Sequence, residues 1–456
     1  MRSVGKSALI RSLCGVTKAE LQLVCLEGHQ TDVQTTIAIN SLVVAAMPAL
    51  QDLTIGIPST LAGDLDRVLP RTEHLTKLAV HFPDGWSSED CACFYTENAL
   101  KSGLLHLQYL QDLSLSELPM EVDLGVLGHW LPHGLTSLSL LFEPECQDPA
   151  EQSLQHLSEL HTLQRLRVSG CLQRRQVLPP TLSRLTWLDL TRNSHVNWDV
   201  SLDFSFAGAT DLQHLDISGS ELVGWPDGLE ELRALTHLDM RGCACETLPP
   251  DGIMLPPQLE FLALGTSHDT YWELDPTALP SLTHLTAIRH LTCQQCKPQQ
   301  LVAALPMLCN LTFSDFRGCK LKDSELQLQP LSALVSLGLS HCDLSRAPPG
   351  LRACTRLTML ELSDNPLGDA SCQLPLEDLT RLQHIGLARC NLQMFPGMPQ
   401  GGLPHLTFLA LQGNAFPAVL AAQHKWLLKL FPALGTERLY ISKEYRKAPG
   451  MERLRP

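Results

Sequence analysis

Aromatic or histidine side chains recur two residues before an aspartate in the middle of the chain. The triplets are Trp-Leu-Asp at 187–189 and His-Leu-Asp at 214–216 and 237–239. In a strand, alternate side chains point to the same face, so each ring and its carboxylate would be displayed together. Rings anchor protein interfaces and carboxylates pair with Arg or Lys, which predicts a surface for a protein ligand that carries basic residues. We expect this surface to comprise Trp187, Asp189, His214, Asp216, His237, Asp239, Phe261 and His284.

The same imidazoles and carboxylates are acceptable metal ligands. A flat row of strands, however, does not bring four ligands to one point, as the tetrahedral geometry of zinc requires. The cysteine pairs at 91 and 93, 243 and 245, and 293 and 296 have no second pair at zinc-finger spacing. We therefore expect no metal site and no cofactor.

The extreme N-terminus holds the one motif that is typical of an enzyme. Gly5-Lys6-Ser7 matches the end of a P-loop, in which backbone amides hold phosphates, Lys reaches the β/γ-phosphates and Ser binds Mg²⁺. The first glycine of that motif would fall before Met1, and no strand precedes it. An N-terminal capping helix that contains these residues is the simpler interpretation, and a truncated P-loop NTPase is the alternative. With no nucleophile elbow and no paired acid/base motif, we do not expect an enzyme.

The elements that must position the rings follow from an internal repeat. The string L-x-x-L-x-L starts at Leu212, Leu235 and Leu259, at spacings of 23 and 24 residues. With degenerate copies there are about sixteen, at a period within the ~20–29 residues of known arrays. The further starts are Leu21, Leu50, Leu75, Leu110, Leu135, Leu163, Leu185, Leu282, Leu311, Leu334, Leu357, Leu382 and Leu406.

This pattern resembles the leucine-rich-repeat family over most of the chain. The ninth position of the family's repeat holds Asn193, Asn365 and Asn414 in some copies and Cys171, Cys243, Cys319, Cys342 and Cys390 in others. The resemblance implies an α/β fold, a horseshoe solenoid with a parallel β-sheet on the concave face. Short helices, 3₁₀ turns and loops would form the convex face, where proline disfavours long helices.

The repeat boundaries suggest four parts. Residues 1–20 would be an N-terminal capping segment and residues 21–417 the repeat array, which is irregular before about residue 160. Residues 418–434 have the apolar spacing of an amphipathic capping helix, and residues 435–456 form a basic tail.

Charge and composition limit the partners. The chain has 34 Lys and Arg against 48 Asp and Glu, and a formal net charge of -14 repels nucleic acid. No apolar run reaches the ~18–20 residues that cross a bilayer, and no secretory signal is evident, so we expect no membrane partner.

Sixteen dispersed cysteines then indicate reduced thiols and a cytoplasmic protein, with a cytoskeletal or ciliary axoneme location as an option. The one glycosylation pattern, Asn310-Leu311-Thr312, falls in a predicted strand and is interpreted as chance.

Together these features predict a non-catalytic, monomeric scaffold that binds a protein partner on its concave face. Two alternatives stay open: a substrate-recognition subunit of an F-box-type ubiquitin ligase, although no F-box is visible, and the truncated P-loop NTPase. The ring and aspartate columns also have a simpler explanation, because the repeat template itself tolerates His and Asp as ordinary surface residues.

Overall fold

The computed structural model contains two compact units, Met1–Leu235 (unit 1) and Thr236–Pro456 (unit 2). It describes residues 16–22, 47–56, 74–82, 101, 103–118, 122–142, 152–172, 174–193, 202–220, 222, 224–243, 254–265, 279–321, 326–368, 374–393, 402–415, 431, 433 and 439–440.

Unit 1 is a stack of coils that share one parallel sheet. Each strand pairs in parallel with the strand of the next coil, in chain order. The strands are β1 (Lys18–Gln22), β2 (Asp52–Gly56), β3 (Lys77–His81), β4 (Asp112–Leu118), β5 (Ser137–Phe142), β6 (Arg165–Ser169), β8 (Trp187–Asp189) and β10 (His214–Asp216). A second, small sheet pairs β7 (Arg175–Val177) with β9 (Asp203–Ser205).

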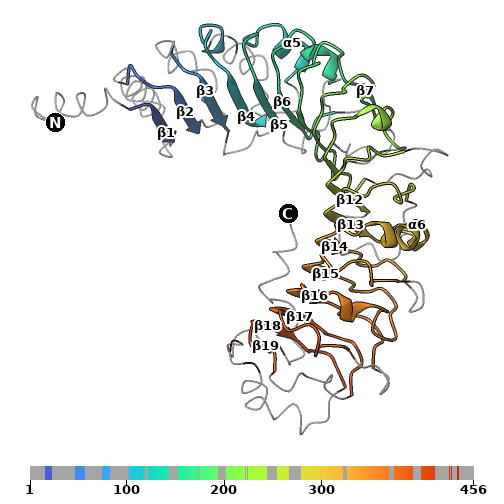
Figure 1. Cartoon of the computed structure of the whole chain (residues 1–456). Helices are drawn as coiled ribbons and strands as arrows, with labels where there is room; N and C mark the ends of the chain where they lie inside the picture. The colour runs from blue at the N-terminus through green and yellow to red at the C-terminus, as the bar shows by residue number, and fades with distance from the viewer. Residues whose placement is uncertain are drawn as a thin grey trace, which may run out of the picture. The chain divides into compact units, whose positions relative to one another are not determined.

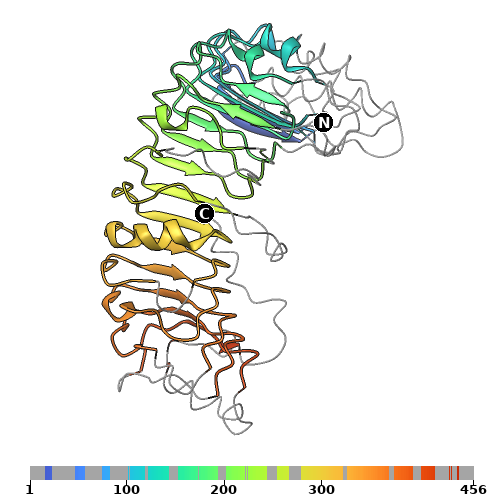
Figure 2. The same cartoon turned by 90° about the vertical axis from the view of Figure 1, so that its right-hand side faces the viewer.

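Unit 2 repeats this arrangement with shorter strands, again parallel and in chain order. They are β11 (His237–Asp239), β12 (Phe261–Gly265), β13 (His290–Gln294), β14 (Phe313–Asp315), β15 (Ser336–Gly338), β16 (Met359–Glu361), β17 (His384–Gly386), β18 (Phe408–Ala410) and β19 (Leu439–Tyr440). The strands occupy one side of the coils and α6 the other (Figure 1). In the turned view of Figure 2, α6 faces the viewer.

The side of the coils opposite the strands consists mainly of turns and short helices. They are α5 (Leu124–Gly128), η2 (Leu154–Leu157), η3 (Leu229–Glu231), α6 (Pro298–Ala304), η4 (Leu305–Met307) and η5 (Leu351–Ala353). Local sequence explains where two of them begin. The Asp123 side chain accepts a hydrogen bond from the Gly125 amide at the start of α5, and Pro298 stands in the first turn of α6, where no amide donor is needed.

The leucines of the repeat form the core. In the β10 coil, Leu212, Leu215 and Ile217 are completely buried, while His214 between them is only half-buried. A strand directs alternate side chains to opposite faces, so each coil buries its leucines against the next coil and leaves the third and fifth positions on the open face of the sheet. Burying one such leucine stabilises the fold by about 1.5–3 kcal/mol. A single coil could not gain this stabilisation alone, because the next coil covers its leucines.

Asparagine at the ninth position satisfies the backbone where the chain turns out of the strand. The Asn193 side chain accepts hydrogen bonds from the amides of Cys171 and Leu172, at 3.1 and 3.0 Å. It donates to the carbonyls of Val168 and Leu190, both at 2.8 Å. Where cysteine takes this place, the thiol donates to one carbonyl of the preceding coil, as Cys342 does to Phe316 at 3.0 Å. The asparagines and cysteines at the ninth position therefore form an Asn/Cys ladder, which joins neighbouring coils through buried hydrogen bonds.

The predicted solenoid of parallel strands and short helices is confirmed. The first described strand, β1, spans the boundary expected between residues 20 and 21, and Leu21 pairs with Ile55, so it closes its repeat motif instead of opening it. The expected helix at 418–434 lies outside the described residues except for Phe431 and Ala433. Within the predicted basic tail, Leu439–Tyr440 forms β19, which pairs with β18.

Candidate protein-binding face

Four rings form a continuous stack on the open face of unit 2. They come from the third position of β11 to β14, and we call His237, Phe261, His290 and Phe313 the ring ladder. Their centroids are separated by 3.8, 4.3 and 4.0 Å, with interplanar angles of 10°, 21° and 6°. The parallel register produces this stack, because strands about 4.8 Å apart bring residues at the same position into contact. The ladder is a rigid, half-buried surface feature of the kind that anchors protein interfaces.

The stacking decides which part of each ring a ligand can touch. In the interior of the ladder, Phe261 and His290 have a neighbouring ring against each face. A partner therefore meets ring edges, and the aromatic faces that a Lys or Arg side chain would need are already occupied. Burial and, to a smaller extent, the charge of nearby Arg241 together lower the pKa of His290 to about 4, with Asp239 acting in the opposite direction. The ladder centre is therefore uncharged at neutral pH.

The third position has a different chemistry in unit 1. Trp187 and His214 stack with their centroids 5.2 Å apart. The earlier strands carry an alternating row of charges instead: Lys18 contacts Asp52 at 3.1 Å, and Lys77 contacts Asp112 at 3.0 Å. Asp112 raises the pKa of Lys77 by a hydrogen bond and by its charge, with a smaller contribution from Asp52. These charges neutralise one another along the sheet.

The predicted acidic column serves the fold. Asp189, Asp216 and Asp239 each accept a hydrogen bond from the amide two residues later, at 2.9–3.0 Å. Asp189 and Asp239 are also buried and contact Arg167 and Arg241. All three carboxylates thus terminate their strands, and those of Asp189 and Asp239 also bind basic groups of this chain, as expected if Asp is part of the repeat template.

Two further acids of this column lie over glycines of the next strand. A Cβ atom added to Gly338 would stand 2.8 Å from the Asp315 carboxylate, and one added to Gly386 would overlap the Glu361 carboxylate. Glu361 also contacts His384 at 3.2 Å. Burial raises the pKa of Glu361, but the hydrogen bond and charge of His384 and two hydrogen bonds from Ser363 outweigh burial and hold it below its usual value.

The prediction that His284 lies in the ring column is wrong. His284 precedes β13, where its Nε2 donates to the Leu255 carbonyl at 2.8 Å. His290 takes the expected place, paired with Phe261 and Phe313. The segment from Leu282 to Cys293 contains two overlapping versions of the repeat motif, and the version that opens with Ile288 is the strand. The complete match Ile-x-x-Leu-x-Cys, six residues further on, was the signal that could have located His290.

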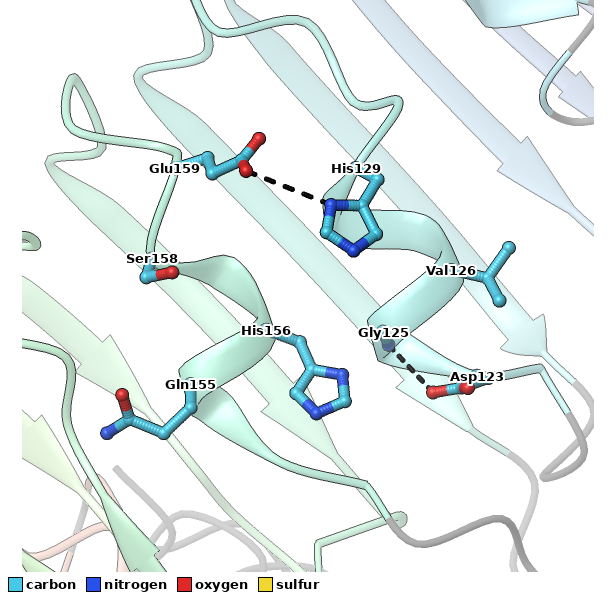
Figure 3. A pocket seen from close by; sticks show the side chains of 8 residues that line it. All are labelled: Asp123, Gly125, Val126, His129, Gln155, His156, Ser158 and Glu159. Atoms are coloured by element: carbon cyan, nitrogen blue, oxygen red, sulfur yellow. Dashed lines mark hydrogen bonds and ion pairs between the residues drawn. The ribbon is translucent and has the colours of Figure 1, made fainter.

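On the opposite side of unit 1, α5 and η2 border an open hollow of about 440 Å³. Its lining includes the titratable residues Asp123, His129, His156 and Glu159, which are drawn in Figure 3. His129 Nδ1 lies 3.8 Å from the Glu159 carboxylate, and both side chains are largely exposed. Among the described residues, no group of three His, Cys, Asp or Glu side chains could hold a metal ion. The P-loop-like residues Gly5–Ser7 lie outside the described part of the chain.

The chain shares its repeats with known proteins, although no family model matches it. It is 30% identical to the mouse CD180 antigen over 211 residues, which is 45% of this chain and 28% of that protein. It is 26% identical over 280 residues to the transforming growth factor beta activator LRRC33 of Danio rerio, 53% of this chain and 39% of that protein. The matches thus span well under half of these relatives' length. A leucine-rich-repeat protein of Leptospira interrogans superposes with a TM-score of 0.53 over 94% of this chain and 97% of its own, at 16% identity, which supports the fold alone.

Stacked coils with a shared parallel sheet, a leucine core and an Asn/Cys ladder define a class of solenoid that typically serves as a protein-interaction scaffold. This chain is a leucine-rich-repeat protein.

The expected cytoplasmic location, with its cytoskeletal or axonemal option, is wrong. The relatives are membrane-associated leucine-rich-repeat receptors, which contradicts it. That expectation relied on dispersed cysteines and on the lack of an evident secretory signal. Eight of the nine cysteines among the described residues are buried. Free cysteine is commonly buried as a small apolar residue, so a core position accounts for these thiols without reference to the compartment. No helix in the described part of the chain is long and apolar enough to cross a membrane.

Proposed function

We propose that this protein is a non-catalytic binding module whose ring ladder is the centre of a protein-binding surface. The observation that carries the proposal is the unbroken stack of four half-buried rings on β11 to β14. Stacked rings lose little conformational entropy when a partner covers them, because their rotamers are already fixed by their neighbours. The related proteins are, as a class, receptors and scaffolds without enzymatic activity.

The proposed partner surface differs from a stripe that selects basic ligands. The carboxylates beside the rings are bonded within this chain, and the inner ring faces are covered by other rings. The partner therefore presents apolar groups or hydrogen-bond acceptors to the ring edges. In unit 1, Trp187 and His214 offer a second, smaller ring pair of the same kind.

The fold itself supplies conservative variants for the test. Ser336 occupies the ring position in β15, so this position accepts serine without loss of the coil. We expect Phe261→Ser with Phe313→Ser to abolish capture of the partner while the unfolding transition stays near that of the wild type. The matched control is Phe408→Ser, which removes a ring from the separate His384–Phe408 pair.

The measurement is quantitative affinity capture from cells that express the full chain with each variant. Proteins retained by the wild type and by Phe408→Ser, but lost by the double variant, support the ring ladder as the binding centre. Equal retention by all three chains contradicts it. The ubiquitin-ligase and NTPase alternatives have no support among the relatives.

A further inference from the structure

The sequence suggested that the sequon Asn310-Leu311-Thr312 falls within a strand. In the structure it lies just before β14 and begins in a turn. Asn310 and Cys309 form the turn before β14, and both are exposed, whereas Leu311 is buried. Asn310 Nδ2 donates one hydrogen bond, to the Thr286 carbonyl at 3.0 Å. The sequon therefore lies on a surface turn, at the edge where the strands of unit 2 begin. Surface turns and loops are the positions that N-glycosylation acceptors occupy.

We infer that Asn310 is an N-glycosylation site. It is the single Asn-x-Ser/Thr pattern in the sequence. The relatives are membrane-associated receptors, a class of protein that matures in the compartment where this modification is made. The sequon signal, the exposed turn and the class of relative are independent observations that agree.

The chemistry needs a lipid-linked oligosaccharide diphosphate as the sugar donor. The bond between the Asn310 Nδ2 atom and the sugar C1 atom forms, the bond between C1 and the diphosphate oxygen breaks, and Nδ2 loses one proton. Nδ2 keeps its second hydrogen, which is enough for the bond to the Thr286 carbonyl. The folded coil can therefore carry the glycan without giving up a native contact.

The array provides a close structural control for the hydroxyl that the sequon requires. Thr312 Oγ1 donates to the Arg289 carbonyl at 2.9 Å, and Thr358 Oγ1 makes the same contact to Val335 at 3.2 Å in a coil without a sequon. Thr312→Val and Thr358→Val remove equivalent hydrogen bonds, but only the first destroys the sequon. Arg356 is the exposed counterpart of Asn310 in the Thr358 coil, so Arg356→Asn places a sequon on an equivalent turn.

The experiment expresses the full chain in human cells and compares its electrophoretic mobility before and after peptide-N-glycosidase treatment. We expect the wild type and Thr358→Val to lose one glycan on treatment, Asn310→Gln and Thr312→Val to show no change, and Arg356→Asn to lose two. The glycosidase converts a glycosylated asparagine to aspartate when it removes the glycan. Peptide mass spectrometry would therefore detect aspartate at position 310.

Two results overturn the inference. If Arg356→Asn carries one glycan and the wild type none, the chain meets the glycosylation machinery but Asn310 is not a site. If neither carries a glycan, the chain does not reach that machinery. Both results leave the proposal for the ring ladder intact, because that proposal is tested by partner capture.

Discussion

Replacing one ladder asparagine tests how the coils of unit 2 are held together. Asn365 is 1% exposed, and its side chain makes four short backbone contacts. It accepts from the amides of Cys342 and Leu344, both at 3.0 Å, and donates to the carbonyls of Leu339 and Leu362, at 2.7 and 2.8 Å. Asn365→Ala removes all four, and at a net ~1 kcal/mol for each hydrogen bond the expected loss is about 4 kcal/mol.

A cysteine at the same position should be less damaging. Cys390 stands at this position in the next coil, and its thiol donates to the Leu362 carbonyl at 3.2 Å. Asn365→Cys can make one such bond but leaves the amides of Cys342 and Leu344 without an acceptor, so we expect a loss of about 2–3 kcal/mol. Burial of the apolar thiol offsets little of this loss, because the Asn365 site is already closed to solvent.

The assay combines urea unfolding of bacterially produced protein with hydrogen exchange of individual amides. Exchange is needed because an array can open locally without unfolding as a whole. We expect the Cys342 and Leu344 amides to lose protection in both variants. Asn310→Ala, at an exposed position with one side-chain hydrogen bond, is the control. A loss below about 1 kcal/mol in Asn365→Ala, with both amides still protected, would refute the reasoning.

Two further predictions concern the open face of unit 2. Because the pKa of His290 falls to about 4 in the folded chain, the unfolded state binds more protons between pH 6.5 and 4, and stability should decrease as the pH falls through that window. Partial exposure reduces the effect to about 1–2 kcal/mol, and His290→Phe should flatten this dependence in unfolding measured at pH 7 and pH 5. Gly386→Ala should lower the unfolding midpoint, because its methyl group meets the Glu361 carboxylate, and the same substitution should cost less in a Glu361→Ala background than in the wild type. An unchanged midpoint in the single variant would show that the carboxylate moves aside freely.

The sequence determined most of the fold, because the repeat places leucines at spacings that only a stack of strands can bury. It was less reliable where a motif was degenerate. Ile288 and Cys293 replace two leucines of the pattern, so Leu282 and Leu285 gave the apparent register and placed His284 in the ring column. The parallel pairing of β12, β13 and β14 is a tertiary fact that corrects this.

The role of the aspartates could be recognised only from the structure. Periodicity shows that Asp239 and His237 share a face, but it does not show that the Asp239 carboxylate turns toward the Arg241 amide and becomes buried. Side-chain direction at a strand end depends on the next two residues and on the neighbouring coil. Location was equally out of reach, since most cysteines in the described part of the chain fill core positions, which account for them without reference to the compartment.

The two carboxylates that lie over glycines couple their coils to the coils that follow. Asp315 lies over Gly338 and Glu361 lies over Gly386, so at these two places a side chain on the following coil would have to displace a carboxylate. Duplicating the β16 coil would place a second glutamate where Gly386 now lies beside Glu361. At these two places the order of coils is thus constrained pair by pair, and a copied module inserted there would have to match both of its neighbours.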